Sequence, residues 1–282
     1  MTTPSPESAL VRIPSNDREP RHPAGVGVPF TPKQDAPALL ARSLYKQYKG
    51  AEYPALQDFN LEVKKGEFFG LLGPNGAGKT TSLSVFSGLL MPDSGTLQVT
   101  GKQFGWQAKA IKEIFGLVPQ EIALYDNLTA QEHLVFFGKL HGLGKEKLHK
   151  RVRTCLEVAG LLDRASRLVG TYSGGMKRRL NIAATLLHEP EILFLDEPTV
   201  GVDAQSRNMI HEQLQEANRG GTTILYTSHS MDEAQKLCTR IGIIDQGSII
   251  KQGVPSSLIA ESGLATLEEL FLHLTGRQLR DA

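Results

Sequence analysis

Cysteine is scarce in this sequence, and the two that occur lack the spacing of a disulfide framework or a metal site. Cys155 and Cys238 lie far apart in a chain of 282 residues. Small disulfide-stabilised domains and zinc modules need paired or clustered cysteines. The sequence therefore excludes both classes, and we expect the two thiols to be ordinary buried side chains.

Long apolar runs and an excess of one charge are also missing. No apolar stretch approaches the roughly 18 residues that a membrane-spanning helix requires. If the protein acts at a membrane, we expect another chain to cross it. The formal net charge is only +1, which argues against a broadly basic nucleic-acid surface. Nucleic acid is therefore not an expected partner.

Proline is unevenly distributed along the chain. Eight of the 15 prolines fall in residues 1–37, a segment with mixed charges and almost no apolar periodicity. Such a segment buries too little surface to offset the entropy lost on ordering. We predict a disordered Pro-rich tail at 1–37. It also lacks the continuous apolar stretch of a signal peptide. A solvated tail is favoured over a segment that docks on a partner.

Strand-like and helix-like segments alternate through the rest of the chain. Short apolar runs predict strands at 40–48, 57–63, 67–72, 95–100, 115–119, 192–195, 223–227 and 241–244. Capping residues and periodicity predict helices at 79–90, 129–141, 145–162, 174–188, 204–218, 231–239 and after Thr266. This alternation predicts an α/β fold with a mainly parallel sheet. The region 121–188 is mostly helical and is inserted between strands.

A glycine-rich loop follows the predicted strand at 67–72 and opens the next helix. Its glycines let successive backbone N–H groups turn inward around an anion. Lys79 adds a point charge for the β- and γ-phosphates, and the Thr80 hydroxyl is a ligand for Mg²⁺. We therefore predict that the loop binds a nucleoside triphosphate. The loop consists of Gly73, Pro74, Asn75, Gly76, Ala77, Gly78, Lys79 and Thr80.

Two adjacent carboxylates, Asp196 and Glu197, stand at the end of the apolar strand at 192–195. Ligands of open α/β sheets bind at the carboxyl ends of strands. Burying two carboxylates without a cation would be costly, so we predict that Asp196 binds Mg²⁺ and that Glu197 acts on water. The alternative is an ordinary acidic pair at the surface or at a helix N-terminus.

A second anion-binding turn is predicted at Ser173, Gly174 and Gly175, where a helix begins. Either the chain binds two anions, or one triphosphate is held by turns from two chains, and the residues leave both possibilities open. Gln120 and His229 each follow a predicted strand at the same edge. Taken singly, a glutamine or histidine in such a place is more often structural than functional.

In this order the motifs resemble those of the ATP-binding subunits of ABC transporters. The resemblance covers about residues 38–276. It rests on Gly73–Thr81, Gln120, Tyr172–Leu180, Leu195–Pro198, Gly201–Asp203 and Thr227–His229. It implies a P-loop ATPase cassette at 38–260, with a small antiparallel β subdomain and a helical subdomain at about 121–188. A short C-terminal helix and tail would occupy 261–282.

The resemblance also implies a role for each matching residue. Tyr48 would stack on adenine, and Gly73 to Thr81 would hold the phosphates. Thr80, Gln120 and Asp196 would bind Mg²⁺, with Gln120 also sensing the attacking water. Glu197 would be the general base, and His229 would contact the γ-phosphate. Ser173, Gly174 and Gly175 would clasp ATP held by the partner cassette, with Asp203 at the seam.

A complete machine of this family has two cassettes that sandwich two ATP molecules and drive a transmembrane permease subunit. The resemblance therefore implies a homodimer or heterodimer attached to the cytoplasmic face of the inner (plasma) membrane, with the helices at 121–172 as the coupling surface. The form Tyr172-Ser-Gly-Gly-Met176 looks like bacterial exporters of drugs, antibiotics and lipid-linked glycans. An importer ATPase and a non-transport ABC ATPase are the alternatives. Met176 stands where Gln is usual and cannot hydrogen-bond a ribose.

Overall fold

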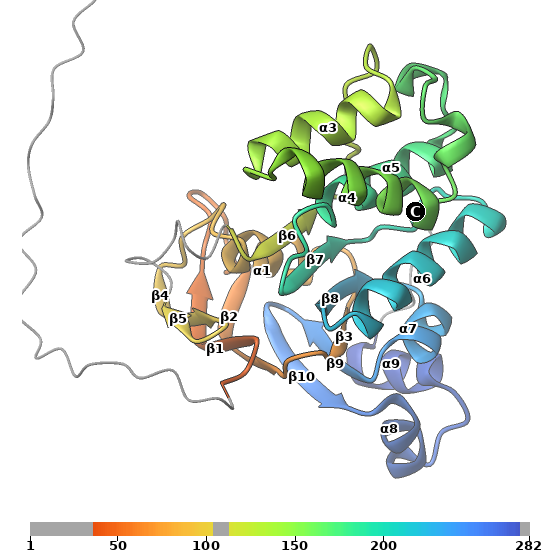
Figure 1. Ribbon diagram of the computed structural model, residues 1–282. Helices are drawn as coiled ribbons and strands as arrows, with labels where there is room; N and C mark the ends of the chain where they lie inside the picture. The colour runs from red at the N-terminus through yellow and green to blue at the C-terminus, as the bar shows by residue number, and fades with distance from the viewer. Residues whose placement is uncertain (1–35, 104–112, 277–282) are drawn as a thin grey trace, which may run out of the picture. The chain divides into compact units, whose positions relative to one another are not determined.

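The computed structural model describes residues 36–103 and 113–276. The tail predicted for 1–37 lies almost entirely outside this part of the chain. The strands of the described residues form two sheets, one with four strands and one with six. Helices cover the outer face of the larger sheet, and helix α1 (Lys79–Phe86) lies between the two sheets (Figure 1).

The smaller sheet is antiparallel and has the strand order β2-β1-β4-β5. Its side chains alternate between the core and solvent, as in a sheet with one buried face. In β2, for example, Phe59 and Leu61 are buried while the residues beside them are exposed. The strands are β1 (Leu39–Lys46), β2 (Leu56–Val63), β4 (Ser94–Val99) and β5 (Lys102–Gln103).

The larger sheet has the strand order β10-β9-β3-β8-β7-β6 and is parallel except for β10. Every residue of β3, β7 and β8 is buried, which explains the apolar runs of β3 and β7 and the apolar centre of β8. The prediction of a mainly parallel sheet is confirmed. The strands are β3 (Phe68–Leu72), β6 (Phe115–Val118), β7 (Ile192–Asp196), β8 (Thr223–Ser228), β9 (Arg240–Asp245) and β10 (Ser248–Gly253).

The register of the parallel strands brings their carboxyl ends to one edge. Leu72 of β3 pairs with Ser228 of β8, and Asp196 of β7 pairs with Thr227. Val118 of β6 in turn pairs with a residue of β7. The segments that follow β3, β6, β7 and β8 therefore emerge side by side, where ligands of such sheets bind.

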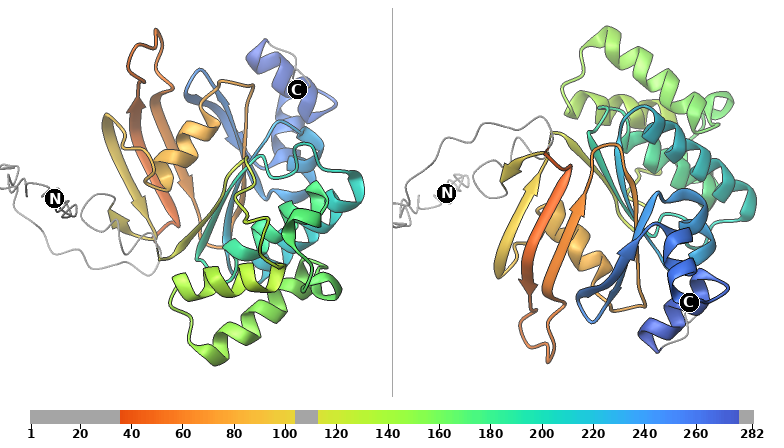
Figure 2. Two further views of the ribbon diagram at one scale, coloured as in Figure 1. Left: turned by 90° about the horizontal axis from the view of Figure 1, so that it is seen from above. Right: turned by 90° about the horizontal axis from the view of Figure 1, so that it is seen from below.

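Helix α1 (Lys79–Phe86) lies between the two sheets (Figure 2). Phe86 packs against Phe59 of the small sheet and Phe194 of the large one, with ring centroids 5.9 and 6.1 Å apart. Each fully buried ring contributes about 1.5–3 kcal/mol to stability. The prediction of a helix to residue 90 was wrong, because Gly88 adopts a positive φ of 68° and turns the chain away.

Three helices gather at one end of the large sheet (Figure 1). They are α3 (Ala130–Leu140), α4 (Lys145–Val158) and α5 (Gly174–Thr185). Thr129 and Glu132 form the predicted capping box of α3. Helices α4 and α5 end four and three residues before their predicted ends at 162 and 188. Two short 3-10 turns, η1 (Leu162–Arg164) and η2 (Val169–Thr171), connect α4 with α5.

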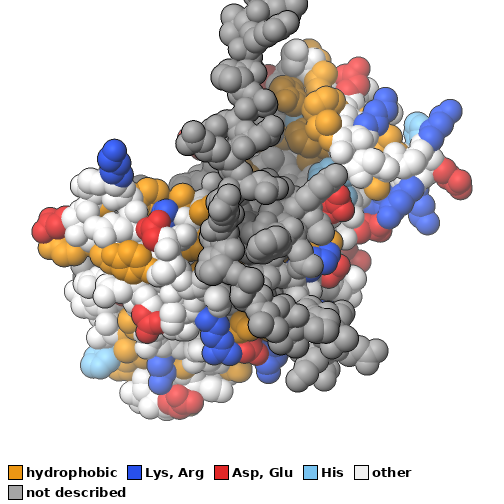
Figure 3. Space-filling model, turned by 90° about the vertical axis from the view of Figure 1, so that its left-hand side faces the viewer, with side chains coloured by type: hydrophobic (Ala, Val, Ile, Leu, Met, Phe, Trp, Pro, Cys, Tyr) orange, Lys and Arg blue, Asp and Glu red, His pale blue; other side chains and the backbone are white. Residues whose placement is uncertain are grey.

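The remaining helices are α6 (Ala204–Arg219), α7 (Met231–Leu237), α8 (Pro255–Ser262) and α9 (Leu267–Thr275). The predicted helix after Thr266 is α9, and its apolar side chains Leu267, Leu270 and Phe271 are buried in the same core as β3 and β8. Helix α8 crosses the predicted boundary at residue 260. No helix in the described part of the chain is long and apolar enough to span a membrane. On the face seen in Figure 3, charged side chains of both signs are interspersed.

Candidate active site

A cavity of about 520 Å³ opens at the carboxyl edge of the large sheet. Segments from five places in the chain line it, and all of its residues except Ala55 and Val200 are site residues predicted from the sequence. The lining residues are Tyr48, Ala55, Asn75, Gly76, Gly78, Lys79, Thr80, Thr81, Gln120, Glu197, Val200 and His229.

The glycine-rich loop has the backbone shape that an anion site needs. Gly76 and Gly78 have φ values of 79° and 108°, a region that side chains disfavour. At Gly78 a Cβ would strike the carbonyl oxygen of Ala55, and at Gly73 it would lie 2.7 Å from Ile244 Cγ2. Close packing therefore requires glycine at both positions. Helix α1 begins at Lys79, within the loop motif, and directs its positive end towards the cavity.

Lys79 is buried, with 5% of its side chain exposed. Its ammonium donates hydrogen bonds to the carbonyl oxygens of Gly73 at 2.8 Å and Pro74 at 3.2 Å. The same nitrogen lies 3.1 Å from Oε1 of Glu197. The Lys79 ammonium is thus held by the main chain of the loop and also forms an ion pair with the Glu197 carboxylate.

A hydroxyl and a carboxylate converge beside the loop. Thr80 Oγ1 donates a hydrogen bond to Oδ2 of Asp196 at 2.8 Å, and Thr227 Oγ1 donates to the other oxygen, Oδ1, at 2.8 Å. Gln120 follows β6 and lines the same cavity. Hydroxyl, carboxylate and amide oxygens are the hard ligands that Mg²⁺ takes, usually with several waters. The donor set therefore fits this ion.

Glu197 has a strained backbone. Its φ of 45° is a left-handed conformation that non-glycine residues rarely adopt, and such strain costs about 1–3 kcal/mol and clusters at functional sites. Its N–H donates to Thr227 Oγ1 at 2.9 Å, and its carbonyl accepts from the Arg178 guanidinium at 3.1 Å. Neighbours on both sides thus hold the residue in this conformation.

Glu197 and His229 form a polar pair, with Oε2 of the carboxylate 3.4 Å from Nδ1 of the ring. Hydrogen bonding to His229 is the largest influence on the pKa of Glu197 and lowers it, while burial opposes this effect and Lys79 adds to it. The same contact raises the pKa of His229 against the opposing effect of burial. The geometry therefore favours an ionised carboxylate and a protonated imidazole.

Tyr48 and the second glycine turn complete the predicted set. Tyr48 is about half exposed, and its hydroxyl lies 3.3 Å from Thr81 Oγ1. Ser173 caps α5 by accepting a hydrogen bond from the N–H of Met176 at 3.3 Å. Gly174 is exposed, whereas a Cβ at Gly175 would strike the Ser206 side chain. The Ser173–Gly175 turn does not line the cavity, so the two glycine turns predicted to bind anions lie at separate places in the chain's structure.

Sequence reasoning missed Glu233 of α7, a buried carboxylate close to the site. It accepts hydrogen bonds from Tyr226 at 2.6 Å and Thr199 at 2.8 Å. Burial opposes its ionisation, but contacts with His211, Tyr226 and Thr199 outweigh burial and lower the pKa of the Glu233 carboxyl to about 2. In the sequence Glu233 resembles any acid in the first turn of a helix, so no local signal marks it. Its hydrogen bonds connect Thr199, in the segment after Glu197, with Tyr226 of β8.

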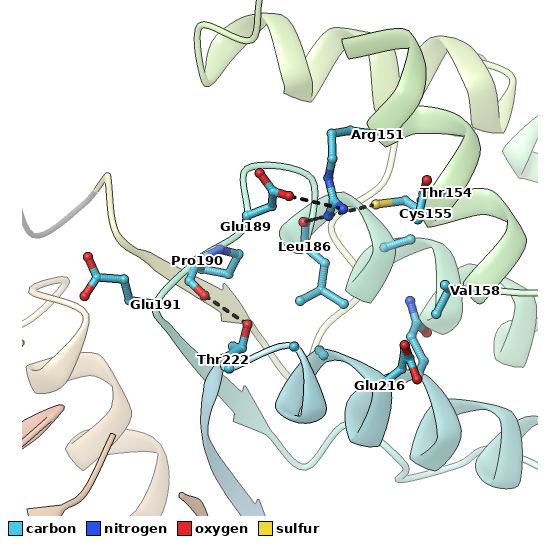
Figure 4. Close-up of a pocket in the computed structure, with 15 residues that line it drawn as sticks. Arg151, Thr154, Cys155, Val158, Leu186, Glu189, Pro190, Glu191, Glu216 and Thr222 are labelled. Carbon is cyan, nitrogen blue, oxygen red and sulfur yellow. Dashed lines mark hydrogen bonds and ion pairs between the residues drawn. The ribbon is translucent and has the colours of Figure 1, made fainter. Parts of the chain in front are cut away.

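A second cavity, of about 460 Å³, lies between α4, α6 and the segment at 189–191 (Figure 4). None of the predicted site residues lines it. Arg151 donates hydrogen bonds there to the carbonyl oxygens of Leu186 at 2.7 Å and Leu187 at 3.1 Å. These bonds satisfy carbonyls beyond the end of α5, so we interpret Arg151 as a structural residue.

The fold and the first cavity together define a class of protein. A glycine-rich loop runs from the buried strand β3 into a helix, and the carboxylate of Asp196, at the end of strand β7 of the same sheet, accepts a hydrogen bond from the loop threonine. This combination is the phosphate and Mg²⁺ site of P-loop nucleoside triphosphatases.

Comparison with known proteins identifies the family. The family described as "ABC transporter" matches residues 56–200. The chain is 48% identical over 232 residues to the linearmycin resistance ATP-binding protein LnrL of Bacillus subtilis, covering 82% of this chain and 74% of that protein. It is 41% identical over 237 residues to the Nod factor export ATP-binding protein I of Ralstonia nicotianae, covering 84% and 72%. The chain therefore belongs to the ABC transporter family, as an ATP-hydrolysing cassette.

Solved structures agree with this assignment. An ATP-binding subunit of an ABC transporter superposes with a TM-score of 0.76 at 28% identity, over 84% of this chain and 99% of that one. A dimeric ATP-binding cassette in a post-hydrolysis state, bound to ADP and Pi, superposes with a TM-score of 0.70 at 27% identity. That match covers 77% of this chain and 98% of the other.

Proposed function

We propose that this cassette powers the export of a compound of the drug, antibiotic or lipid-linked glycan class, through a separate membrane subunit. The convergence of the Lys79 ammonium and the His229 ring on Glu197, at 3.1 and 3.4 Å, is the observation that carries its catalytic part. The names of the relatives, linearmycin resistance and Nod factor export, support the direction of transport and the kind of cargo.

Within the site, Glu197 is the general base that takes a proton from the attacking water. Lys79 binds the β- and γ-phosphates, and His229 contacts the γ-phosphate while it orients Glu197. Tyr48 stacks on the adenine ring. These roles are supported by the placement of all four side chains on one cavity. The backbone of Gly73, Pro74, Asn75, Gly76, Ala77 and Gly78, together with Thr80 and Thr81, cradles the phosphates.

Mg²⁺ is the proposed cofactor, held by Thr80, Asp196 and Gln120. The hydrogen bond between the Thr80 hydroxyl and the Asp196 carboxylate, at 2.8 Å, supports this assignment. When bound, the ion would offset the negative charge of the phosphate oxygens. Gln120 links this position to the helical region that begins after β6.

We propose that the second anion-binding turn completes the site of another chain. Ser173, Gly174 and Gly175 would hold the γ-phosphate of ATP bound to a partner cassette, in a homodimer or heterodimer. Two observations support this: the turn does not line the cavity of its own chain, and the matching solved cassette is dimeric. Asp203, the N-cap of α6, would lie at the dimer seam.

The membrane subunit is proposed to dock on the helical region at 121–172, at the cytoplasmic face of the inner (plasma) membrane. Large apolar side chains exposed near α3 support such a contact. Tyr125 and Phe136, for example, are 51% and 40% exposed, and their rings pack edge to face with centroids 5.7 Å apart. Exposed aromatic clusters of this kind are typical of protein interfaces.

Co-purification tests the partner. We expect the tagged full chain, extracted from its native membranes, to bring with it an integral membrane protein that stimulates ATP hydrolysis. Recovery with ribosomal particles alone would contradict a transport role.

Resistance tests the direction of transport. In a susceptible bacterial host, the chain and its membrane partner should raise the inhibitory concentration of one or more antibiotics, and the Glu197→Gln variant should not. Nutrient uptake that requires the intact cassette would instead indicate an importer.

A further inference from the structure

Arg178 of α5 is a buried cation that joins three segments of the site. Only 3% of its surface is exposed. Its guanidinium donates hydrogen bonds to the carbonyl oxygens of Pro119 and Pro198, both at 2.7 Å, and of Glu197 at 3.1 Å. Three donors of one planar group thus engage three main-chain acceptors. Because the guanidinium fork is rigid, these acceptors are fixed relative to one another.

The positions of these acceptors point to a role in the reaction. Pro119 precedes Gln120, and the other two carbonyls belong to Glu197 itself and to the residue after it. Arg178 is also only five residues after Ser173, on the helix that begins at the second anion-binding turn. One side chain therefore connects that turn to both the proposed water sensor and the proposed base.

We propose that Arg178 is a positioning residue that holds Gln120 and Glu197 in register with the Ser173–Gly175 turn. This inference rests on the proposed function, in which the turn binds ATP of a partner cassette. When the turn engages that phosphate, α5 is fixed in place, and Arg178 fixes the carbonyls of the two catalytic segments with it. Assembly of the dimer and alignment of the base are then mechanically linked.

The next residue provides a matched control. Arg179 is also buried on α5, with 6% of its surface exposed, and donates to the carbonyl oxygens of Ala159 and Gly160. These acceptors follow α4 and lie outside the proposed active site. Arg178 and Arg179 thus share residue type, helix and kind of bond, and differ in which segments they hold.

The test compares Arg178→Met with Arg179→Met in the full-length protein, at protein concentrations where parental turnover per chain has reached its plateau. Methionine keeps most of the aliphatic volume and removes the donors. We expect the two variants to lose similar thermal stability. Arg178→Met should lose kcat by about 10²-fold, because small displacements of catalytic groups have effects of that size. Its KM for ATP and its affinity for ATP should stay within about threefold of the parent.

Arg178→Lys should recover part of the lost kcat, since an ammonium can still donate to one or two of the carbonyls. If either methionine variant fails to fold, the same comparison is made between Arg178→Lys and Arg179→Lys. Equal kcat values for the paired variants would overturn the positioning role. A parent without ATPase activity, or full turnover by Glu197→Gln, would instead overturn the proposed function and this inference with it.

Discussion

Lys79 and Glu197 are in direct contact, with the ammonium nitrogen 3.1 Å from carboxylate oxygen Oε1. They come from two different strand ends, since Lys79 opens the helix after β3 and Glu197 follows β7. The residue proposed to bind phosphate therefore also balances the charge of the proposed base. His229 contacts the second carboxylate oxygen, so Glu197 is held between the Lys79 ammonium and the His229 imidazole.

Replacing Glu197 by glutamine keeps the shape of the side chain and removes its basicity. We expect Glu197→Gln to bind ATP with nearly parental affinity, because the phosphate loop is untouched. Turnover should fall by about 10²–10⁴-fold, the usual contribution of a general base, and dimers should accumulate with ATP. Steady-state ATPase assays and size-exclusion chromatography measure the two effects. Turnover within about twofold of the parent would exclude Glu197 as the base.

The Glu197–His229 pair should make stability depend on pH. The pKa of His229 is raised from 6.5, so its contribution is complete below pH 6.5 and is lost as pH rises through the raised value. The pKa of Glu197 is lowered from 4.5, so its contribution is present above pH 4.5 and is lost as pH falls through the lowered value. The pair therefore stabilises most between pH 4.5 and 6.5.

Thermal unfolding of the parent and of His229→Gln across pH 4 to 9 checks this dependence. A partly exposed pair contributes about 1 kcal/mol or less, which corresponds to a Tm difference of about 2–4 °C in a protein of this size. The difference should be largest near pH 5.5 and should shrink above the raised pKa of His229. The same Tm difference at every pH would show that the pair is not charged in the folded protein.

The two glycines of the second turn should differ in their tolerance of alanine. A Cβ at Gly175 would lie 2.5 Å from Ser206 Cβ, whereas a Cβ at Gly174 would meet no atom within 4 Å. We expect Gly175→Ala to lose about 1–3 kcal/mol of unfolding free energy through overpacking. Gly174→Ala should be at least as stable as the parent, because alanine favours a helix more than glycine does. Urea denaturation measures both values, and equal stabilities would contradict the close packing of α5 on α6.

Local patterns predicted much of the site. Lys79 and Thr80 lie in a contiguous motif, and Asp196 ends an apolar strand that only a buried parallel position explains. Because parallel strands share a carboxyl edge, the sequence predicts that these residues and Gln120 come together. Lys79, Thr80 and Gln120 line one cavity, and Asp196 accepts a hydrogen bond from Thr80 beside it. Ala55 and Val200 line the same cavity but carry no distinctive chemistry.

The features that the sequence did not reveal depend on contacts between distant segments. Arg178, for example, is distinguished only by its hydrogen bonds to carbonyl oxygens of residues 19 to 59 positions away along the chain. Strand β10 escaped prediction because Lys251 and Gln252 are exposed on a sheet edge, which leaves no apolar pattern. Helix ends were misplaced where a glycine such as Gly88 or Gly160 adopts a positive φ.

Mixing two inactive variants tests most directly whether one ATP site is built from two chains. Ser173→Asp keeps a good N-cap for α5 but places a negative charge where the partner's phosphate would bind. Glu197→Gln lacks the base. In a mixed dimer, the intact turn of one chain meets the intact base of the other. We predict that each variant alone is nearly inactive and that an equal mixture recovers about a quarter of parental ATPase activity, since half of randomly formed dimers contain one complete site. A mixture as inactive as its components would contradict the shared site.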